Sequence, residues 1–574
     1  MRKFRMLSLL LAVLMSVSVL TACNNSTPNA TTAAPGATTT KSNATTTAPG
    51  GTTAATAAAV PTELKVCVGP EPDSIDPAYN EAVDGATMLI HAFAGITKLD
   101  KNGVPQPDMA KEVKVSTDLL TYTITLRDGL KWSDGKALVA QDFIYAWQRA
   151  IDPKNATVYG YMLGNIKGVN DIIAAKPDSK YDLNSIGAKA TDDKTIVITL
   201  DAPTSYFMEI LAFPTLFPVR KDIVEGNDKW ATDPKTYISN GPYRMKSWVT
   251  KSEIVFEKNP NYYDAKSIGP DTIRFVLMDD DNAILAAFKS GGIMFADSFP
   301  NDEIDALRNT PEFNLASQLG TYYFGYNCTK APFDNVKVRQ ALSLAIDRNF
   351  IVEKIGKAGQ LPAGAYVPVG MTDGDPTKEF RTVGGDYYSV KAADYAANVT
   401  KAKALLSEAG YPDGKGFPKF EYMFNTSTGN KLIAEALQNM WKTTLGVDCT
   451  LVEQEWGVFL TTRQNGAYQV ARNGWLADYN DPITFLDMWV TDGGNNDSKW
   501  SNKDYDALIA GVKAGSDRIK RYADMHKAED ILMKEAPVAP IYYYVDMFLK
   551  STKLNGFYSS PLGYKYFMYT SIAK

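Results

Sequence analysis

The chain has 574 residues with a formal net charge of −5; 45% of its residues are hydrophobic and 11% aromatic. Its acidic and basic residues are well mixed, which argues against a nucleic-acid-binding protein, because such proteins carry a basic patch or stripe. The only histidines are His91 and His526. Ser-His-Asp and zinc hydrolases need a histidine beside further catalytic or ligating residues. Neither histidine has such a setting, so we interpret both as packing or surface residues.

The first residues of the chain are typical of a secretory signal. Basic residues precede an apolar run, Leu7–Leu20, which is too short to span a bilayer and ends in small residues before Cys23. The junction from Leu20 to Cys23 resembles a bacterial lipobox, in which the cysteine receives a diacylglyceryl group and becomes the mature N-terminus. We therefore expect a lipoprotein signal peptide over 1–22 and lipid attachment at Cys23. The alternative is an ordinary secretion signal with a chance cysteine.

Residues 23–59 contain almost no large apolar side chain and are rich in Thr, Ala and Pro. Such a segment cannot offset the entropy of ordering, so we expect a disordered linker between the lipid anchor and the folded part. A glycosylated stalk would have the same composition. No later run is long and apolar enough to span a membrane.

The remaining chain, about 515 residues, is too long for one hydrophobic core and implies two or three domains. Its cysteines, Cys67, Cys328 and Cys449, are widely spaced. That spacing fits neither a disulfide framework nor a metal site, and it suggests at least one buried free thiol. We expect no metal and no cofactor.

Hydrophobic patterns predict strands first and helices later in the chain. Alternating apolar residues indicate half-buried strands at 121–126 and 195–200, and a shorter one at 253–257. Asp334 is a candidate cap for a helix with apolar positions from Val338 to Ile346. Further helices are expected over about 392–409 and 431–445, each ending at a glycine. Interspersed strands and helices indicate an α/β protein with mixed sheets.

Five blocks of sequence together resemble bacterial solute-binding proteins of the oligopeptide-binding family, which deliver peptides to ABC importers. In chain order these blocks are Gly69–Pro77, Leu126–Trp147, Ser239–Arg244 with Asn259–Tyr263, Ala331–Leu342 and Gly474–Tyr479. They follow the family's order and cover nearly everything from about Val60 to the C-terminus. Any one block could arise by chance, whereas five in order could hardly do so.

The resemblance implies a two-lobed, periplasmic-binding-protein-like α/β fold with an additional inserted domain. Lobe I would comprise 60–93, 221–294 and 547–574, the inserted domain 94–220, and lobe II 295–546. Two lobes hinged by crossing strands can close over a ligand and bury it.

The constant features of a peptide are its backbone and its two charged ends. In the family, the aspartate of the Trp-x-Ala-Asp-Tyr motif binds the α-ammonium of the peptide, which implies this role for Asp478. From the residues alone, Asp478 could instead only stabilise the turn that follows it.

The other ligand-binding positions are also implied by the resemblance. Gly474, Trp475 and Leu476 would pair with the ligand backbone from one lobe, and Glu81, Ala82 and Val83 from the other. Leu476 replaces a cysteine of the relatives, which leaves backbone pairing possible. Tyr159 and Asn240 match positions that touch the ligand. Lys330, Arg463 and Arg472 stand where the family keeps cations for the peptide carboxylate, although each could be a surface charge or an internal ion pair. Asn430 replaces a histidine, which puts carboxylate binding there in doubt.

We therefore expect a lipid-anchored, extracytoplasmic and monomeric binding protein without catalysis, which captures oligopeptides for an ABC permease. Other ligands known in the family are dipeptides, cell-wall or signalling peptides, nickel complexes and oligosaccharides; the scarcity of histidine counts against nickel. The alternative from another class is a secreted hydrolase with a carboxylate pair. Runs such as Asp279-Asp280-Asp281 are usually solvated faces.

Overall fold

The computed structural model describes residues 62–573. The predicted signal peptide, the predicted linker and Cys23 lie outside the described residues, so these assignments stay predictions. Within the described part of the chain, no helix is long and apolar enough to cross a membrane.

An 11-stranded sheet dominates the described part of the chain, in the order β15-β14-β16-β12-β17-β11-β1-β10-β9-β8, with β13 pairing with β17. The first strand group is β1 (Glu63–Cys67), β8 (Tyr243–Val249), β9 (Glu253–Lys258), β10 (Thr272–Val276) and β11 (Phe295–Ala296). The second strand group is β12 (Phe313–Tyr326), β13 (Leu361–Pro362), β14 (Phe420–Asn425), β15 (Cys449–Gln454), β16 (Val470–Leu476) and β17 (Val538–Lys550). Parallel pairs, such as β1 with β10 and β14 with β15, occur beside antiparallel ones. The predicted α/β class with mixed sheets is confirmed.

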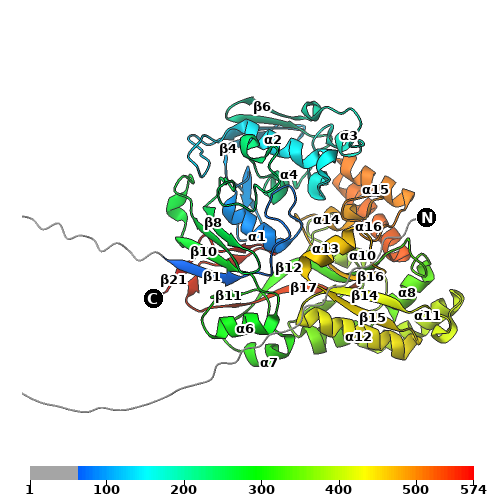
Figure 1. Ribbon diagram of the computed structural model, residues 1–574. Helices are drawn as coiled ribbons and strands as arrows, with labels where there is room; N and C mark the ends of the chain where they lie inside the picture. Colours follow the sequence, from blue (N-terminus) through cyan, green and yellow to red (C-terminus); the bar gives the residue numbers. More distant parts are fainter. Residues whose placement is uncertain (1–61, 574) are drawn as a thin grey trace, which may run out of the picture. The chain divides into compact units, whose positions relative to one another are not determined.

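Strand β17 joins the two strand groups. It pairs antiparallel with β12 over most of its length, and its last residues, Leu549 and Lys550, pair with β11 of the first group. Figure 1 shows β17 passing between the two groups. The expected boundary between 546 and 547 falls inside this shared strand, and the domain boundaries stay a prediction.

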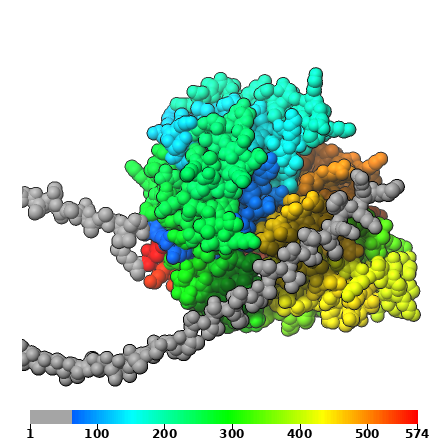
Figure 2. Space-filling model, viewed as in Figure 1, coloured from blue at the N-terminus to red at the C-terminus, as the bar shows by residue number. Residues whose placement is uncertain are grey.

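Residues 94–220, here called the inserted segment, contain a separate four-stranded sheet in the order β4-β5-β7-β6. Its strands are β4 (Ala110–Val115), β5 (Thr121–Leu126), β6 (Ala188–Asp192) and β7 (Thr195–Thr199). Inward and outward residues alternate strictly in β5 and β7, which confirms the two predicted half-buried strands. In Figure 2 the cyan surface at the top of the view belongs to this segment.

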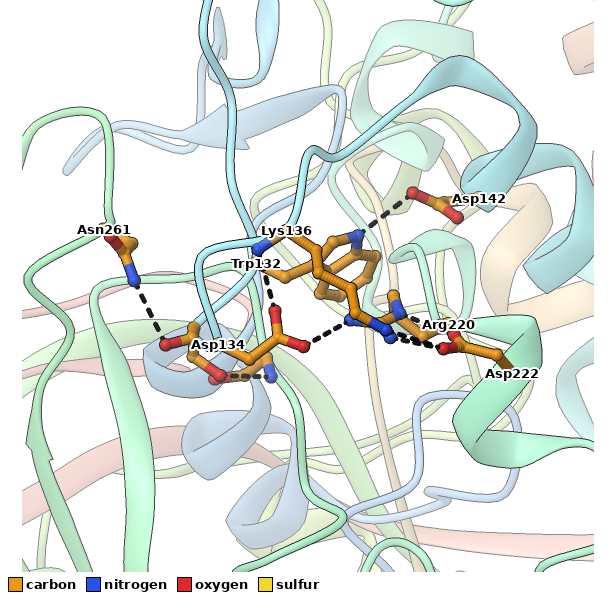
Figure 3. A network of polar contacts seen from close by, with 9 residues as sticks. Trp132, Asp134, Lys136, Asp142, Arg220, Asp222 and Asn261 are labelled. Carbon is orange, nitrogen blue, oxygen red and sulfur yellow. Dashed lines mark hydrogen bonds and ion pairs between the residues drawn. The ribbon is translucent and has the colours of Figure 1, made fainter.

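Two of the sequence blocks, Leu126–Trp147 and Ser239–Arg244 with Asn259–Tyr263, meet with Arg220 and Asp222 in one polar network, drawn in Figure 3. The Nη1 of Arg220 donates to Asp134 at 2.7 Å, and Trp132 donates to Asp142 at 3.0 Å. The amide of Asn261 donates to the carbonyl of Ser133 at 3.1 Å. Of these three bonds, the one from Asn261 joins the inserted segment to the loop after β9, and the other two lie within the inserted segment. The blocks that carry the resemblance therefore serve packing here.

The predicted helices are present with shifted starts. The helix expected after Asp334 is α8 (Val336–Leu344), but its cap is Asn335, whose side chain accepts the Lys337 N–H. The Asp334 cap is therefore wrong by one residue, because the helix begins one residue later. α11 (Tyr395–Glu408) and α12 (Thr428–Leu445) end before glycines with positive φ, as expected. α12 packs on β14 and β15.

The other helices are short or lie on the faces of the sheets. In chain order they are α1 (Val83–Ala92), α2 (Ala140–Ile151), α3 (Val169–Ile173), α4 (Phe207–Ile210), α5 (Lys221–Val224), α6 (Asp281–Lys289), α7 (Ile304–Leu307), α9 (Arg348–Phe350), α10 (Phe380–Gly384), α13 (Trp456–Gln464), α14 (Ile483–Leu486), α15 (Lys503–Ala514) and α16 (Arg518–Glu535). Three two-stranded sheets complete the fold: β2 (Thr97–Leu99) with β3 (Pro105–Pro107), β18 (Leu554–Asn555) with β21 (Ser571–Ile572), and β19 (Tyr558–Ser559) with β20 (Lys565–Tyr566).

Both histidines serve packing, as predicted. His91 is fully buried; its Nδ1 lies 2.6 Å from the Thr87 carbonyl oxygen and its Nε2 accepts the Phe567 N–H. Burial lowers the pKa of His91 to about 4, so the ring is neutral. His526 stacks on Phe380 and pairs with Asp373 at 2.7 Å. Cys67, Cys328 and Cys449 are free thiols, and two of them are buried.

Candidate ligand-binding cavity

A cavity of about 520 Å³ lies between the two strand groups and beneath part of the inserted segment. It is lined by residues from β16 and α13 on one side, from the start of α1 and the end of β11 on the other, and by Tyr159 and Phe213 of the inserted segment. Eleven of the predicted ligand-binding residues line it: Glu81, Ala82, Val83, Tyr159, Asn430, Arg463, Arg472, Gly474, Trp475, Leu476 and Asp478. Residues from distant parts of the chain are thus brought to one site.

Two predicted residues lie elsewhere. Asn240 is buried, and its side-chain amide accepts the Ala94 N–H at 3.1 Å and donates to the Ala94 carbonyl at 2.9 Å. This bidentate clamp holds the backbone that enters the inserted segment. Lys330 lies in the loop after β12, outside the cavity lining. The ligand roles predicted for both residues have no support from their positions.

Strand β16 presents an incompletely paired edge to the cavity. Its residues from Val470 to Leu476 pair with β12, whereas on the other side β14 pairs only with Val470 and Ala471. No described strand occupies the outer edge beyond Ala471. A Cβ at Gly474 would lie 2.3 Å from the hydroxyl of Tyr544, so a glycine is needed where this tyrosine approaches the strand. An extended ligand can add to such an edge by backbone hydrogen bonds.

The opposite wall is the segment from Glu81 to Val83. Ala82 is extended, with φ −131° and ψ 152°, and it precedes α1 without a side-chain cap. Gln464 of α13 donates a short hydrogen bond to the carboxylate of Glu81, which links the two walls. Burial, with Asp73 nearby, raises the pKa of Glu81 to about 7.

Asp478 follows the free edge of β16 and is 8% exposed. Its Oδ2 lies 3.4 Å from Thr484 Oγ1 and 3.5 Å from the Tyr161 hydroxyl, both of which donate to it. No lysine or arginine of residues 62–573 pairs with this carboxylate. Burial, with Asp487 nearby, raises the pKa of Asp478 well above its usual range. A cation brought by a ligand would stabilise the ionised form.

Arg472 and Arg463 differ in how their charges are compensated. Arg463 donates to Asp497 at 2.6 Å and to Asn473 at 2.9 Å, so it is already paired. Arg472 lies over the Tyr322 ring and donates to the Tyr544 hydroxyl at 3.2 Å. Its Nε is buried without a hydrogen-bond partner in the described structure. Arg472 is therefore the cation of this wall that can accept a ligand carboxylate.

Asn430 is buried in a neutral network. It accepts a hydrogen bond from the Tyr322 hydroxyl at 3.0 Å and donates to Asn425 at 3.0 Å. The doubt about carboxylate binding there is consistent with this setting, because both groups of the amide are engaged.

Sequence reasoning missed part of the lining. Phe213, Asp84, Asp297, Asp546 and Lys565 reach the cavity from four separate stretches of chain. No motif marks them, and only their burial and proximity reveal them. Asp281 is also not a solvated charge, because it is buried and accepts the Thr428 N–H at 2.8 Å.

Comparison with known proteins places this geometry in context. A model described as bacterial extracellular solute-binding proteins, family 5 Middle, matches residues 104–497. The oligopeptide-binding protein OppA of Bacillus subtilis (strain 168) is 36% identical over 513 residues, which cover 88% of this chain and 92% of that protein. OppA of Haemophilus influenzae, solved in complex with RPPGFSPFR, is 31% identical with a TM-score of 0.83, over 90% of this chain and 99% of that one.

A third relative has been solved in two forms. One structure of the murein tripeptide-binding protein MppA of Escherichia coli is 33% identical and gives a TM-score of 0.84, over 90% of this chain and 99% of that one. Its unliganded open form gives 0.60, over 90% and 98%. The described residues therefore differ from the open arrangement of that protein.

Proposed function

This chain belongs to the bacterial extracellular solute-binding proteins of family 5, and from that premise we propose that it captures oligopeptides for an ABC importer. It is a binding protein rather than an enzyme, and it acts outside the cytoplasm. The finer parts of the proposal are the peptide ligand, its enclosure between closing lobes, and the lipid anchor.

The observation that carries the peptide proposal is the buried carboxylate of Asp478 at the end of a free strand edge. The edge of β16 offers backbone groups that any peptide sequence can pair with. Asp478 offers a carboxyl group with no cation partner in the described structure, which a ligand ammonium would stabilise in its ionised form. Together they match the two features that peptides of all sequences share at their N-terminal end. The names of relatives as oligopeptide-binding proteins support the same ligand class.

We expect Asp478→Asn to weaken peptides with a free amino group and to leave the fold intact. Removing one partner of a buried ion pair costs about 3–5 kcal/mol, or roughly 150- to 5,000-fold in affinity. N-acetylated peptides should already bind poorly to the unmodified protein. The substitution should therefore reduce the difference in affinity between free and N-acetylated peptides. Because the ammonium lowers the raised pKa of Asp478, binding should also release protons.

Isothermal titration calorimetry of one peptide, with a free and with an acetylated N-terminus, against the unmodified protein and the Asp478→Asn variant gives a double-mutant cycle. Asp302→Asn, at an exposed carboxylate outside the cavity lining, is the matched control and should change neither affinity. A coupling below about 0.5 kcal/mol would leave Asp478 as a turn residue only. Mass spectrometry of the recovered peptide distinguishes binding from hydrolysis, since a hydrolase consumes it.

The lipid anchor is proposed from the sequence junction at Cys23. Dual acylation holds a soluble domain stably on a membrane, and a variant without the Cys23 thiol cannot receive this modification. Cys23→Ser should release the protein from the membrane fraction of the producing cell, measured by fractionation and immunoblotting. A variant that is fully processed and yet stays with the membrane would contradict the anchor.

A further inference from the structure

Two helices that belong to different hydrophobic clusters meet at their N-terminal ends beside the cavity. α6 lies between β10 and β11 of the first strand group, and its Ile284 and Leu285 pack in a cluster with residues of β1 and β11. α12 lies between β14 and β15 of the second group, and its Ile433 and Leu437 pack in a cluster with residues of β12 and β14. In Figure 1 α6 lies below the first group and α12 below the second. Each helix is therefore anchored on a different side of the cavity.

The carboxylate of Asp281 joins these two helix ends. Asp281 is the first residue of α6 and is 3% exposed. Its Oδ2 accepts the N–H of Thr428, the first residue of α12, at 2.8 Å. Its Oδ1 accepts a short hydrogen bond from the hydroxyl of Ser298, which lies in the link from β11 to β12, between the two strand groups. We call Asp281, Ser298 and Thr428 the Asp281 junction.

Helix ends, rather than a cation, compensate the charge of Asp281. No lysine or arginine of residues 62–573 forms an ion pair with it. The N-terminal end of a helix carries partial positive charge, and α12 is 18 residues long. The Thr428 N–H is one of the groups that a helix leaves without an internal partner. The side chain of Ser427 accepts the Asn430 N–H instead, so the Thr428 N–H depends on an acceptor from the other strand group.

The hydrogen bond between Asp281 and Thr428 is sensitive to the position of one strand group relative to the other. N–H···O bonds lie at about 2.7–3.2 Å, so a relative movement of roughly 1 Å between the helix ends removes this one. A buried carboxylate that loses a donor is destabilised, which opposes such a movement. The junction therefore stabilises the described arrangement, which differs from the open form of the relative MppA.

We infer, on the premise of the proposed function, that the Asp281 junction is a catch for the closed state. Asp281 binds the end of α12 when the two strand groups close on a peptide, and it releases that end when they open. The catch acts on closure, so it raises the affinity for peptides with different ends by the same factor.

The sharpest test is Thr428→Pro, which removes the N–H that Asp281 accepts. Proline suits the first position of a helix, and the preceding Ser427 is extended, with φ −177° and ψ 138°, as residues before proline prefer. The helix should therefore persist. Titration calorimetry should show about 10- to 100-fold weaker binding, the range for a hydrogen bond to a charged group. An alanine peptide with free ends, its N-acetylated form and its C-amidated form should all lose affinity by the same factor.

Asp281→Ala removes the other partner and should weaken the three peptide forms by a similar factor. Because both substitutions delete the same bond, the double variant should bind no more weakly than the weaker single variant, within about twofold. Asp280→Ala is the matched control. The Asp280 carboxylate accepts the Ala283 N–H at 2.8 Å within α6, so this variant loses a helix cap on one side of the cavity only. It should lower thermal stability and leave the three affinities unchanged within about twofold.

Hydrogen exchange in the unmodified protein avoids dependence on the folding of the variants. Saturation with peptide should slow exchange of the Thr428 amide by about tenfold or more, measured by mass spectrometry with residue-level fragmentation. Thr428 itself does not line the cavity, so this protection reports the junction. The Ala283 amide, bonded to Asp280 within its own helix, should change little and serves as the internal reference.

Affinities that stay within about twofold in Thr428→Pro or in Asp281→Ala would overturn the inference and leave the proposed peptide binding standing. A loss that differs among the three peptide forms would also overturn it, since the residues would then act on recognition. The same holds for a Thr428 amide that exchanges equally fast with and without peptide. If the unmodified protein binds none of the three forms, the proposed function fails and the inference fails with it.

Discussion

At the scale of single residues, the site is defined by which charges lack a partner. Asp478 and Arg472 are six positions apart along β16 and its extension, and an extended chain spans roughly 20 Å over that distance. Neither has an ion-pair partner within residues 62–573, whereas Arg463 is paired with Asp497. Residue type alone does not separate Arg472 from Arg463; their surroundings do.

We therefore expect Arg472→Gln to weaken peptides with a free C-terminal carboxylate by about 10- to 100-fold at the length whose carboxylate reaches Arg472. C-amidated peptides of that length should lose much less, because they bring no charge to the site. A length series of alanine peptides, titrated against the unmodified and variant proteins, measures both effects.

Arg463→Gln is the matched comparison for this prediction. It should lower thermal stability, because Asp497 would be left buried without its cation. Its effect on affinity should be the same for peptides with a free C-terminus and for peptides with an amidated one. Equal discrimination by the two variants would contradict the assignment of Arg472.

At the scale of elements, β16 explains why one short motif marks the site. The strand is fixed in the sheet by β12 along its whole length, while β14 pairs with it at only two residues. Its free edge is therefore positioned by a rigid neighbour and still open to a ligand. Apart from Arg220 and Asp222, the residues of the Arg220 network of Figure 3 come from two other sequence blocks, and no residue of the network lines the cavity.

Local patterns predicted three strands and three helices that the structure contains, and the expected alternation failed where both faces of a strand are covered. β5 and β7 alternate because one face is solvated. The strand expected at 253–257 exists as β9, but Ile254, Val255 and Phe256 are all buried, so it does not alternate. A strand covered on both faces reads as a continuous apolar run.

At the scale of the whole described unit, contacts outside the cavity hold its two sides together. Tyr206 of the inserted segment stacks on Tyr479, with ring centroids 4.4 Å apart and an interplanar angle of 2°. Arg521 of α16 lies 5.2 Å from the Tyr206 ring, and Glu209 accepts the Asn480 N–H at 2.7 Å. In Figure 2 the cyan surface of the inserted segment meets the orange surface of α15 and α16. Opening of the cavity would break these contacts.

If the lobes close on the ligand, peptide should reduce the radius of gyration measured by small-angle scattering. Tyr206→Ala should increase the radius of gyration of the unliganded protein. It should also lower the affinity for all peptides equally, by up to about tenfold, because a stacked pair contributes about 0.5–1.5 kcal/mol to the closed state. The ratio of the affinities for free and acetylated peptides should stay unchanged, since Tyr206 does not line the cavity.

Tyr558→Ala is the control for this measurement. It removes a stack of the same 4.4 Å spacing, between Tyr558 and Tyr566 of the β19–β20 pair, and should alter stability without altering closure. Scattering profiles that do not change when the protein is saturated with peptide would contradict a closing mechanism.

The sequence by itself determined the α/β class, the family, three strands and three helices, and Asp478 as a candidate anchor. These features depend on local patterns or on contiguous blocks of residues, which a single chain displays directly. Only the tertiary structure decided that Asn240 packs away from the cavity, and that Arg472 has no ion-pair partner while Arg463 has one. Charge compensation and burial arise between residues far apart in the sequence, 34 positions for Arg463 and Asp497 and 146 for Asn240 and Ala94, so no local pattern shows them.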